Sequence, residues 1–460
     1  MGAESGHVTR AVVFALDPSP AQERLLRSYC GAARFAFNWT IAEVTGNLAV
    51  RAAERDAGVS DMTLTPAVSW SKFSLRKQFN TEKATVAPWA GEVAKHCFDA
   101  GITQAAQALT NWSASKAGSR AGRRVGFPGF KSRDKAKLSV TFVELNHQLS
   151  WLNPSRHGVR LMLPQALLHS KDAHVRRMMQ QLVWLHTVES TRRLFRVVED
   201  GRASIQQVTI SHTGGRWQVS FLVRYAIAAR PVKQPLQRVG GTVGVDVGIT
   251  HLATLSRPID GVTDEFRHVP NPRPLAAQLA RLQQLDRGVA RCRPGSKNRA
   301  RLLARRARVH GRVAATRKMA HHMLANQLAC RFDTVVIEDL NVAGMTHNRP
   351  LARALADVAL GQFRQILTTE CDDRGTRLVT VDRFYPSSKT CSACTAVKAK
   401  LPLGTRVFDC DHCKSILDRD VNAARNLEHQ HVAGLRPETR NADPRPHKTT
   451  RAPARAAVAA

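Results

Sequence analysis

The sequence predicts a multidomain α+β protein, and three observations support this fold class. With 460 residues, the chain is long enough for two to four domains of about 100–200 residues each. Apolar runs at 8–16, 138–163 and 204–225 predict strands that together form a compact β-barrel, interrupted by a helical segment. A second domain opens with a buried strand at 242–256 that turns into another, and continues with helices and short buried strands, as in an α/β domain.

Composition and charge narrow the class of protein. Hydrophobic residues make up 43% of the chain, and no apolar run approaches the about 18 residues of a membrane-spanning helix, which excludes wholesale disorder and such a span. The N-terminal segment has no signal-peptide pattern and the nine Cys are an odd number, so we expect a reducing, cytoplasmic compartment. The formal net charge of +33 requires a polyanionic partner. Nucleic acid fits better than an anionic membrane surface, because no basic amphipathic anchor stands out.

The spacing of apolar residues predicts the elements of the first half. The first strand ends at an Asp-Pro-Ser-Pro sequence, a helix is expected over 21–44, and a polar stretch follows at 45–65. Two further helices are expected within 70–112. Residues 164–198 also predict a helix, and the last two strands of the barrel flank the hairpin turn His212-Thr213-Gly214-Gly215.

The second domain follows a linker at 229–241. After its opening strands we expect helices over 274–328, buried strands at 334–339 and 377–382, and a helix that begins near 418. This alternation of strands and helices is typical of an α/β domain.

Two basic runs are candidate nucleic-acid contacts. Between 116 and 137 eight Lys or Arg face one Asp, and Phe127 and Phe130 alternate with cations such as Lys131. Bases stack on such rings while the cations hold phosphates. The alternative is a surface loop whose phenylalanines pack into a core.

The second basic run, at 281–318, has thirteen Lys or Arg, one Asp and no aromatic residue. We expect Arg305, Arg306 and Arg312 to contact a phosphate backbone. A solvated helix face is the alternative.

Four cysteines predict a zinc site. Cys391 and Cys394 form one C-x₂-C knuckle, Cys410 and Cys413 form another, and 15 residues lie between the two pairs. Four thiolates at this spacing suit tetrahedral Zn²⁺ and leave no open coordination position, so the zinc is expected to be structural. A thioredoxin-like redox pair and four unrelated cysteines are the alternatives.

Acidic residues form a second candidate site. Asp246 interrupts the strand Val-Gly-Val-Asp-Val, Glu338 and Asp339 end another strand, and Asp418 and Asp420 precede a helix. A carboxylate buried alone is heavily desolvated, whereas several that converge make a cation site. Mg²⁺ prefers such ligands, and two of these ions promote attack of water on a phosphodiester. Capping of a helix by Asp418 and Asp420, or of a turn by Asp339, is the alternative.

These motifs resemble those of the TnpB family, transposon-encoded RNA-guided DNA endonucleases related to the type V CRISPR effectors. The similar segments of the second half are GVDVGITHLATLS, VVIEDLNVAGM, the cysteine segment from FYPSSKTCSAC to FDCDHC, and DRDVNAARNL. The first half also contains segments similar to those of the family: the opening of the chain, VGFPGFKSR, VESTRRL and RWQVSFLV. The resemblance covers about residues 8 to 428.

The resemblance implies a domain order. A wedge β-barrel would be interrupted by a helical recognition domain, and an RNase H-like (RuvC) α/β nuclease domain would follow, interrupted by a four-cysteine zinc ribbon. The implied boundaries are 1–20 and 113–235 for the barrel, 21–112 for the recognition domain, 240–388 and 415–430 for the nuclease domain, 389–414 for the ribbon, and 431–460 for a disordered basic tail.

The resemblance also implies roles and partners. Asp246, Glu338 and Asp420 would be the catalytic acids that hold Mg²⁺, with Asp339 and Asp418 in supporting or capping positions. A monomeric protein would bind a guide RNA and a double-stranded target DNA, with base pairing supplying specificity and the protein reading a short adjacent motif.

Lys77 and Gln78 are candidate contacts to that motif, because long polar side chains on a helix can reach base edges; a solvated helix face is the alternative. Two departures from the family pattern stand out. The segment 167–184 is longer than usual, and Thr395 and Lys414 stand where glycine commonly follows each knuckle, which affects knuckle geometry.

Four alternatives stay open at this point. They are a type V CRISPR effector, an RNA-guided repressor without nuclease activity, a DNA-joining transposase or accessory protein, and a zinc-ribbon RNA-binding protein with structural carboxylates. The presence of all three acids argues against the repressor, and the lack of a clear helix-turn-helix pattern argues against the transposase.

Overall fold

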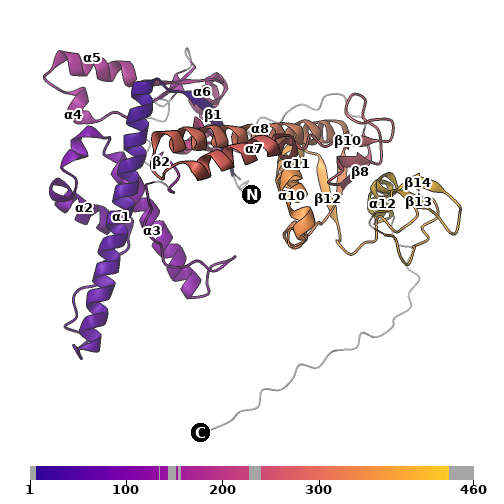
Figure 1. The fold of residues 1–460 in the computed structure, drawn as a ribbon, viewed down its shortest axis with the longest axis horizontal. Helices are drawn as coiled ribbons and strands as arrows, with labels where there is room; N and C mark the ends of the chain where they lie inside the picture. Colours follow the sequence, from indigo (N-terminus) through magenta and orange to yellow (C-terminus); the bar gives the residue numbers. More distant parts are fainter. Residues whose placement is uncertain are drawn as a thin grey trace, which may run out of the picture. The chain divides into compact units, whose positions relative to one another are not determined.

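The computed structural model describes residues 7–133, 135–142, 152–153, 157–226, 240–402 and 404–434. Contacts divide the chain into two compact units, Met1–Pro231 with Ala277–Ala315, and Val232–Ala276 with Thr316–Ala460; Figure 1 shows the elements of both. Most of the predicted linker and of the predicted basic tail lies outside the described residues. Among the described helices, none is long and apolar enough to cross a membrane.

The first unit contains a seven-stranded antiparallel sheet in the order β2-β6-β7-β1-β5-β4-β3. Its strands are β1 His7–Asp17, β2 Ser139–Phe142, β3 Leu152–Asn153, β4 Gly158–Arg160, β5 Trp184–Thr187, β6 Ala203–Thr213 and β7 Arg216–Ala226. The predicted hairpin is confirmed, with Gly214 and Gly215 at its turn and φ angles of 62° and 77°, which glycine adopts without strain. The described strands form a half-barrel sheet, in which no pairing among the described residues joins β2 to β3.

Helix α1 (Pro20–Asp56) begins at a capping box. The Ser19 hydroxyl accepts a hydrogen bond from the Gln22 amide, and the Gln22 side chain accepts one from the Ser19 amide. The helix predicted over 21–44 continues to Asp56, into the stretch identified as polar. Three Ala and two Arg lie between residues 45 and 56, and both residue types favour a helix even when it is exposed to solvent.

Aromatic rings pack α1 against α2 (Lys72–Val86) and α3 (His96–Lys116), with a short 3₁₀ helix, Pro88–Glu92, between them. The ring centroids of Trp39 and Phe79 are 5.0 Å apart, and those of Phe79 and Phe98 are 5.2 Å apart. The two helices predicted within 70–112 are therefore confirmed.

The region predicted to be helical at 164–198 is mixed. It contains α4 (Gln165–Leu168), α5 (Ala173–Leu182) and α6 (Arg192–Glu199), but β5 lies between α5 and α6 and pairs with β1 and β4. Leu185 and Thr187 of β5 are buried by pairing with distant strands. The spacing of apolar residues along the chain does not reveal pairing with distant strands, so the prediction of a continuous helix failed here.

The second unit contains a five-stranded sheet in the order β10-β9-β8-β11-β12. Its strands are β8 Thr242–Val247, β9 His251–Leu255, β10 His268–Pro270, β11 Thr334–Glu338 and β12 Arg377–Val381. Strands β8, β11 and β12 are parallel, and β9 and β10 pair antiparallel at one side. The predicted strands are confirmed, and the apolar sequences of the central strands β8 and β11 reflect burial on both faces of the sheet.

Two long helices confirm the prediction over 274–328, and each contributes residues to both units. These helices are α7 Pro274–Arg291 and α8 Lys297–Arg331. Smaller elements complete the second unit: α9 Val342–Met345, α10 Arg349–Val358, α11 Leu360–Arg374, β13 Val407–Asp409, β14 Ile416–Asp418 and α12 Arg419–Gly434.

Helix α12 packs directly on β8 at Gly244. A Cβ at this position would lie 1.9 Å from the Ala424 carbonyl oxygen and 2.8 Å from the Glu428 amide nitrogen, so the approach requires glycine. Gly244 and Asp246 share a face of β8 because alternate residues of a strand point the same way. Asp420 precedes Ala424 by about one helical turn. The contact therefore brings the first turn of α12 to the carboxyl end of β8.

Gly244→Ala is expected to lower the melting temperature of the second unit by several degrees. The added methyl group displaces α12, overpacking costs about 1–3 kcal/mol or more, and each kcal/mol shifts the melting temperature of a unit of this size by about 2–4 °C. Gly361→Ala in α11 is the matched control, because nothing lies within 4 Å of its added Cβ. Equal melting curves for Gly244→Ala and the unsubstituted chain would contradict this account.

Candidate metal centres and nucleic-acid interface

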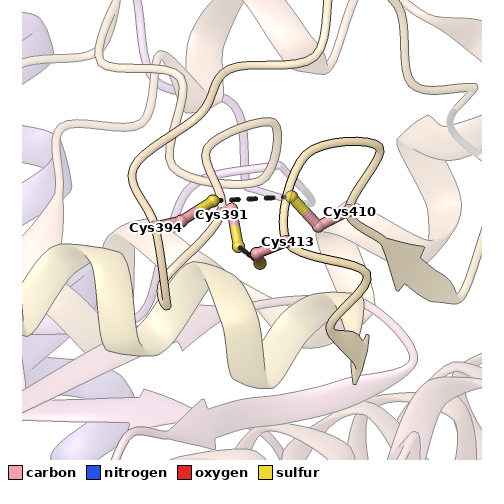
Figure 2. A group of neighbouring side chains, drawn as sticks. All are labelled: Cys391, Cys394, Cys410 and Cys413. Atoms are coloured by element: carbon pink, nitrogen blue, oxygen red, sulfur yellow. Dashed lines mark hydrogen bonds between the residues drawn. The ribbon is translucent and has the colours of Figure 1, made fainter.

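The four predicted cysteines come together at one point (Figure 2). All four Sγ atoms lie within 4.8 Å of one another, and the Cys391–Cys413 and Cys394–Cys410 pairs are each 3.6 Å apart. Sulfurs held about 2.3 Å from Zn²⁺ in a tetrahedron are about 3.8 Å apart, so the cluster suggests a zinc ribbon. Within the described residues it is the one group of three or more His, Cys, Asp or Glu side chains packed this closely.

The residues that follow each knuckle have left-handed backbone. Thr395 has a φ of 64° and Lys414 a φ of 59°, and their amides donate to the carbonyls of Cys391 and Cys410. This conformation costs a non-glycine residue about 1–2 kcal/mol. The missing glycines therefore affect the backbone of each knuckle, as expected from the sequence. A hydrogen bond with the Ser415 hydroxyl lowers the pKa of the Cys413 thiol to about 6, favouring the thiolate that binds metals.

Two asparagines attach α12 to the first knuckle. Asn422 Nδ2 donates to the Thr390 carbonyl at 2.7 Å, and its Oδ1 accepts from the Ser392 amide at 2.8 Å. Asn426 Nδ2 donates to the Ser387 carbonyl at 2.7 Å. Both asparagines are buried, and their amides satisfy backbone groups that would otherwise be unpaired. The ribbon and the first turn of α12 are therefore parts of one assembly.

Cys410→Ser is expected to abolish zinc binding and loosen the start of α12, because the ribbon depends on four thiolates. Elemental analysis should find about one zinc per unsubstituted chain, in line with a single four-sulfur site, and much less in the variant. Cys292→Ser is the control, because this half-buried cysteine follows the end of α7 and lies outside the cluster. The same zinc content in all three proteins would contradict the site.

The three predicted catalytic acids lie at neighbouring ends of β8, β11 and α12. Val245 pairs with Ile337 in the parallel ladder of β8 and β11, so Asp246 and Glu338 follow at the same edge of the sheet. The packing of α12 on Gly244 brings Asp420 toward this edge. The sheet and one helix thus place acids that are far apart in the sequence at one edge, where the charges of Asp420 and Glu338 act on Asp246, although these acids are packed less closely than the four cysteines.

Burial and mutual repulsion act most strongly on Asp246. Burial raises the pKa of Asp246 well above its usual value, and the charges of Asp420 and Glu338 raise it further, against the opposing effect of Arg419. Burial, and then the charge of Asp339, raise the pKa of Glu338. Desolvated carboxyls with mainly negative neighbours are stabilised by a proton or by a bound cation, which fits the donor chemistry of a Mg²⁺ site.

The two remaining acids have structural partners. Asp418 Oδ1 accepts hydrogen bonds from two backbone amides in the first turn of α12, each at 2.9 Å, so it caps that helix. Asp339 does not cap a turn, because its carboxylate pairs with Arg364 at 2.6 Å and with Arg383. These hydrogen bonds lower the pKa of Asp339. Asn341 caps the following short helix instead.

Three polar neighbours of this centre were not found from the sequence. The rings of His251 and His268 stack with centroids 3.9 Å apart, and His268 Nε2 is 3.8 Å from an Asp418 oxygen. Arg406 Nη1 is 3.8 Å from an Asp420 oxygen. These residues come from separate segments, so no local motif indicates that they lie near the acids. Only knowledge that β9 pairs with β10, and β13 with β14, could have indicated it.

Asp246→Asn is expected to raise the melting temperature of the second unit in EDTA by several degrees. The folded state raises the pKa of Asp246, so it binds this proton more tightly than the unfolded chain, and its relative stability falls as pH rises above the unfolded pKa. Removing the charge relieves this penalty at neutral pH. Added Mg²⁺ should raise the melting temperature of the unsubstituted chain and leave that of Asp246→Asn unchanged.

Asp260→Asn, at an exposed position of the same unit, is the matched control for this measurement. It should respond to Mg²⁺ as the unsubstituted chain does. A Mg²⁺ response in Asp246→Asn equal to that of the control would show that Asp246 holds no cation.

The predicted aromatic loop is partly solvent exposed. Phe130 is 64% exposed and Phe127 is 38% exposed, with the Phe127 ring centroid 5.0 Å from that of Trp112. Lys131 Nζ lies 3.6 Å from the centroid of the Phe37 ring, and burial lowers the pKa of Lys131 to about 8. Phe130 therefore has the exposure that base stacking requires, whereas Lys131 is engaged with the protein.

The side chain of Gln78 is bound internally. Its Nε2 donates to Glu43 at 2.8 Å and to Glu82 at 3.2 Å, so contact with a base would first require breaking these bonds. Lys77 is exposed and lines a cavity of about 600 Å³ together with Phe73.

The predicted arginines of α8 differ from one another. Arg305 and Arg312 are exposed. Arg306 pairs with Asp286 of α7, with Nε 2.7 Å from the carboxylate, so part of its charge is neutralised within the protein.

Three family models match the chain. A model described as "Probable transposase" matches residues 223–349, a "Cas12f1-like, TNB domain" matches 361–427, and a "Helix-turn-helix domain" matches 5–49. In the described part of that last span, the structure has β1 followed by a single helix, α1. The matched span therefore does not have the helix-turn-helix structure of the model's description.

Relatives match nearly the whole chain. A Mycobacterium tuberculosis protein is 32% identical over 436 residues, which cover 92% of this chain and 86% of that protein. An Escherichia coli protein is 24% identical over 436 residues, 91% of each chain. Both are named "Putative RNA-guided DNA endonuclease", and three mimivirus relatives of a shorter segment are named "TnpB-like protein". These proteins form a class of transposon-related nucleic-acid proteins. This chain belongs to the TnpB family.

Solved structures include a similar chain in a Cas12f1–sgRNA–target DNA complex. It has a TM-score of 0.49 and 12% identity, over 92% of this chain and 99% of that chain.

Proposed function

We propose that this protein is an RNA-guided, Mg²⁺-dependent DNA endonuclease encoded by a transposable element, which cuts target DNA beside a short sequence motif. The observation that supports the proposal best is the desolvated carboxyl of Asp246, with Glu338 and Asp420 as its charged neighbours, in a chain of net charge +33. The names of the relatives agree with this function. The protein would act as a monomer in the cytoplasm, on DNA of the nucleoid.

In the proposed reaction, Asp246, Glu338 and Asp420 hold the metal. When bound there, Mg²⁺ supplies the positive charge that activates a water and stabilises the leaving oxygen of the phosphodiester. Asp418 keeps the first turn of α12 in place through its two amide hydrogen bonds, so that Asp420 stays beside the sheet. Arg364 and Arg383 neutralise Asp339, which limits the repulsion at Glu338.

Zinc in the four-cysteine cluster would be structural in this proposal. The asparagine contacts of α12 to the first knuckle link the cluster to Asp420. Loss of the metal would therefore reduce cleavage by misplacing an acid, without zinc taking part in the reaction.

A guide RNA would supply sequence specificity through base pairing, while the protein holds the heteroduplex by its backbone. The exposed Arg305 and Arg312 and the ring of Phe130 are the candidate contacts that fit best. Lys77, exposed beside a cavity, is the better candidate of the 77–78 pair for reading the adjacent motif.

Asp246→Ala is expected to abolish cleavage of a target plasmid by the RNA-loaded protein, with at least a thousandfold loss of rate, because one carboxylate of the metal centre is missing. RNA binding should be unchanged. Asp260→Ala is the matched control and should cut normally. Cleavage by Asp246→Ala at the unsubstituted rate would refute the assignment of the centre.

The family description "Probable transposase" favours DNA strand transfer as a second candidate. The same assay separates the two reactions, because hydrolysis yields cut ends that stay free, whereas strand transfer yields joined products. Joined products that form without any RNA would refute the proposed function and support DNA strand transfer instead.

A further inference from the structure

The first unit contains a basic cavity, and none of its lining residues is a predicted metal ligand. It has a volume of about 720 Å³ and is lined by α1, by the segment before β2 and by the end of β6. Its lining residues are Arg27, Ser28, Cys30, Gly31, Arg34, Arg133, Ala136, Lys137, Leu138 and His212. Cavities of about 300–1,000 Å³ accommodate small-molecule or cofactor-sized ligands.

Among the described residues, the lining carries four cations and no acid. Arg27 pairs with Glu23 outside the lining, at 2.6 Å. For the other three, Arg34, Arg133 and Lys137, the described part of the chain provides no ion-pair partner. Several cations around one concave space favour a polyvalent anion such as a phosphate group.

Gly31 leaves the backbone of α1 open to this cavity. It lies in the interior of α1, where glycine costs about 1 kcal/mol relative to alanine. Nothing lies within 4 Å of the position that its Cβ would occupy, so close packing within the protein does not require glycine there. The space above it is the cavity, between Arg27 one turn before and Arg34 one turn after. A ligand that approaches the helix backbone would account for the missing side chain.

The opposite wall is held at both of its ends. The Lys131 amide donates to Asn38 Oδ1 at 2.8 Å, and Asn38 Nδ2 donates to the Lys131 carbonyl at 3.0 Å. At the other end, the His212 amide donates to the Leu138 carbonyl at 2.9 Å. The cations of this wall are thus carried on an anchored segment, so less conformational entropy is lost on binding.

We propose that this cavity binds one unpaired nucleotide of the guide RNA, with its flanking phosphates on Arg34, Arg133 and Lys137. Leu138 and the ring of His212 provide an apolar and aromatic surface for the base. A concave space of about 720 Å³ has room for a single base rather than a duplex, and a base of B-form DNA would first have to be unstacked at a cost of a few kcal/mol. Loops and bulges of folded RNA already present unstacked bases. The inference rests on the proposed function, because it requires a guide RNA.

The test is a variant that fills the cavity without changing charge. Gly31→Leu places a side chain in the cavity and should weaken binding of the RNA at least tenfold. Gly46→Leu is the matched control: it lies in the same helix, and nothing is within 4 Å of its added Cβ either. Both variants should melt at or above the temperature of the unsubstituted chain, because leucine favours a helix more than glycine does.

The probes are the RNA species that co-purifies with the full chain, transcribed in vitro, and a DNA strand of the same sequence, in filter-binding assays. An RNA-specific loss in Gly31→Leu alone supports the inference. Equal RNA affinities for the two leucine variants, or a loss confined to DNA, overturn it, while RNA-directed cleavage by the unsubstituted chain leaves the proposed function standing. If no RNA co-purifies and no RNA-directed cleavage occurs, the proposed function and this inference both fall.

Charge variants give a second readout. In Arg34→Gln and Arg133→Gln the slope of log Kd against log salt concentration should fall by about 0.7 for each phosphate of single-stranded RNA that the variant no longer neutralises. Lys72→Gln, an exposed cation on α2 outside the cavity lining, is the control. Unchanged slopes in both arginine variants would show that these cations do not meet phosphate, and would overturn the assignment.

Discussion

The close approach of α12 to β8 is the contact on which the second unit depends. The Ala424 carbonyl oxygen occupies the space where a Cβ of Gly244 would lie, so a single missing methyl group sets how near the helix comes to the sheet. Because of that distance, the first turn of α12 reaches the edge where Asp246 and Glu338 lie. Asn422 then ties the same turn to the first knuckle. The sheet, the helix and the cysteine cluster therefore act as one rigid support for a group of carboxylates.

Unbalanced charge is a property that the two units share. In the second unit, carboxyls with mainly negative neighbours have raised pKa values and are relieved by a proton or a cation. In the first unit, cations gather around a cavity whose described lining residues include no acid. Each arrangement lowers the stability of the protein alone and favours a ligand of the opposite charge. The same electrostatic reasoning thus supports a metal at one site and a nucleic acid at the other.

Much of the fold followed from local patterns, and the failures have identifiable causes. The hairpin at Gly214 and Gly215, the strand that contains Asp246 and the long basic helices were all predicted, because turn chemistry and apolar periodicity are local properties. Strand β5 was missed because its burial comes from pairing with β1 and β4, far away in the sequence. Gln78 was a candidate contact to nucleic acid, and the sequence did not indicate that its amide donates a hydrogen bond to Glu43, 35 residues earlier.

By itself, the sequence determined the cysteine spacing, the acids beside apolar strands and the excess of positive charge, and these define the chemistry available to the protein. The tertiary structure decided which groups meet. It made Asp418 a helix cap, paired Asp339 with two arginines and brought Arg406 to Asp420. It also left Gly31 facing a cavity. Residue type and spacing limit which bonds a side chain can form, but its partners depend on which distant segments pack together, and packing is a property of the whole fold.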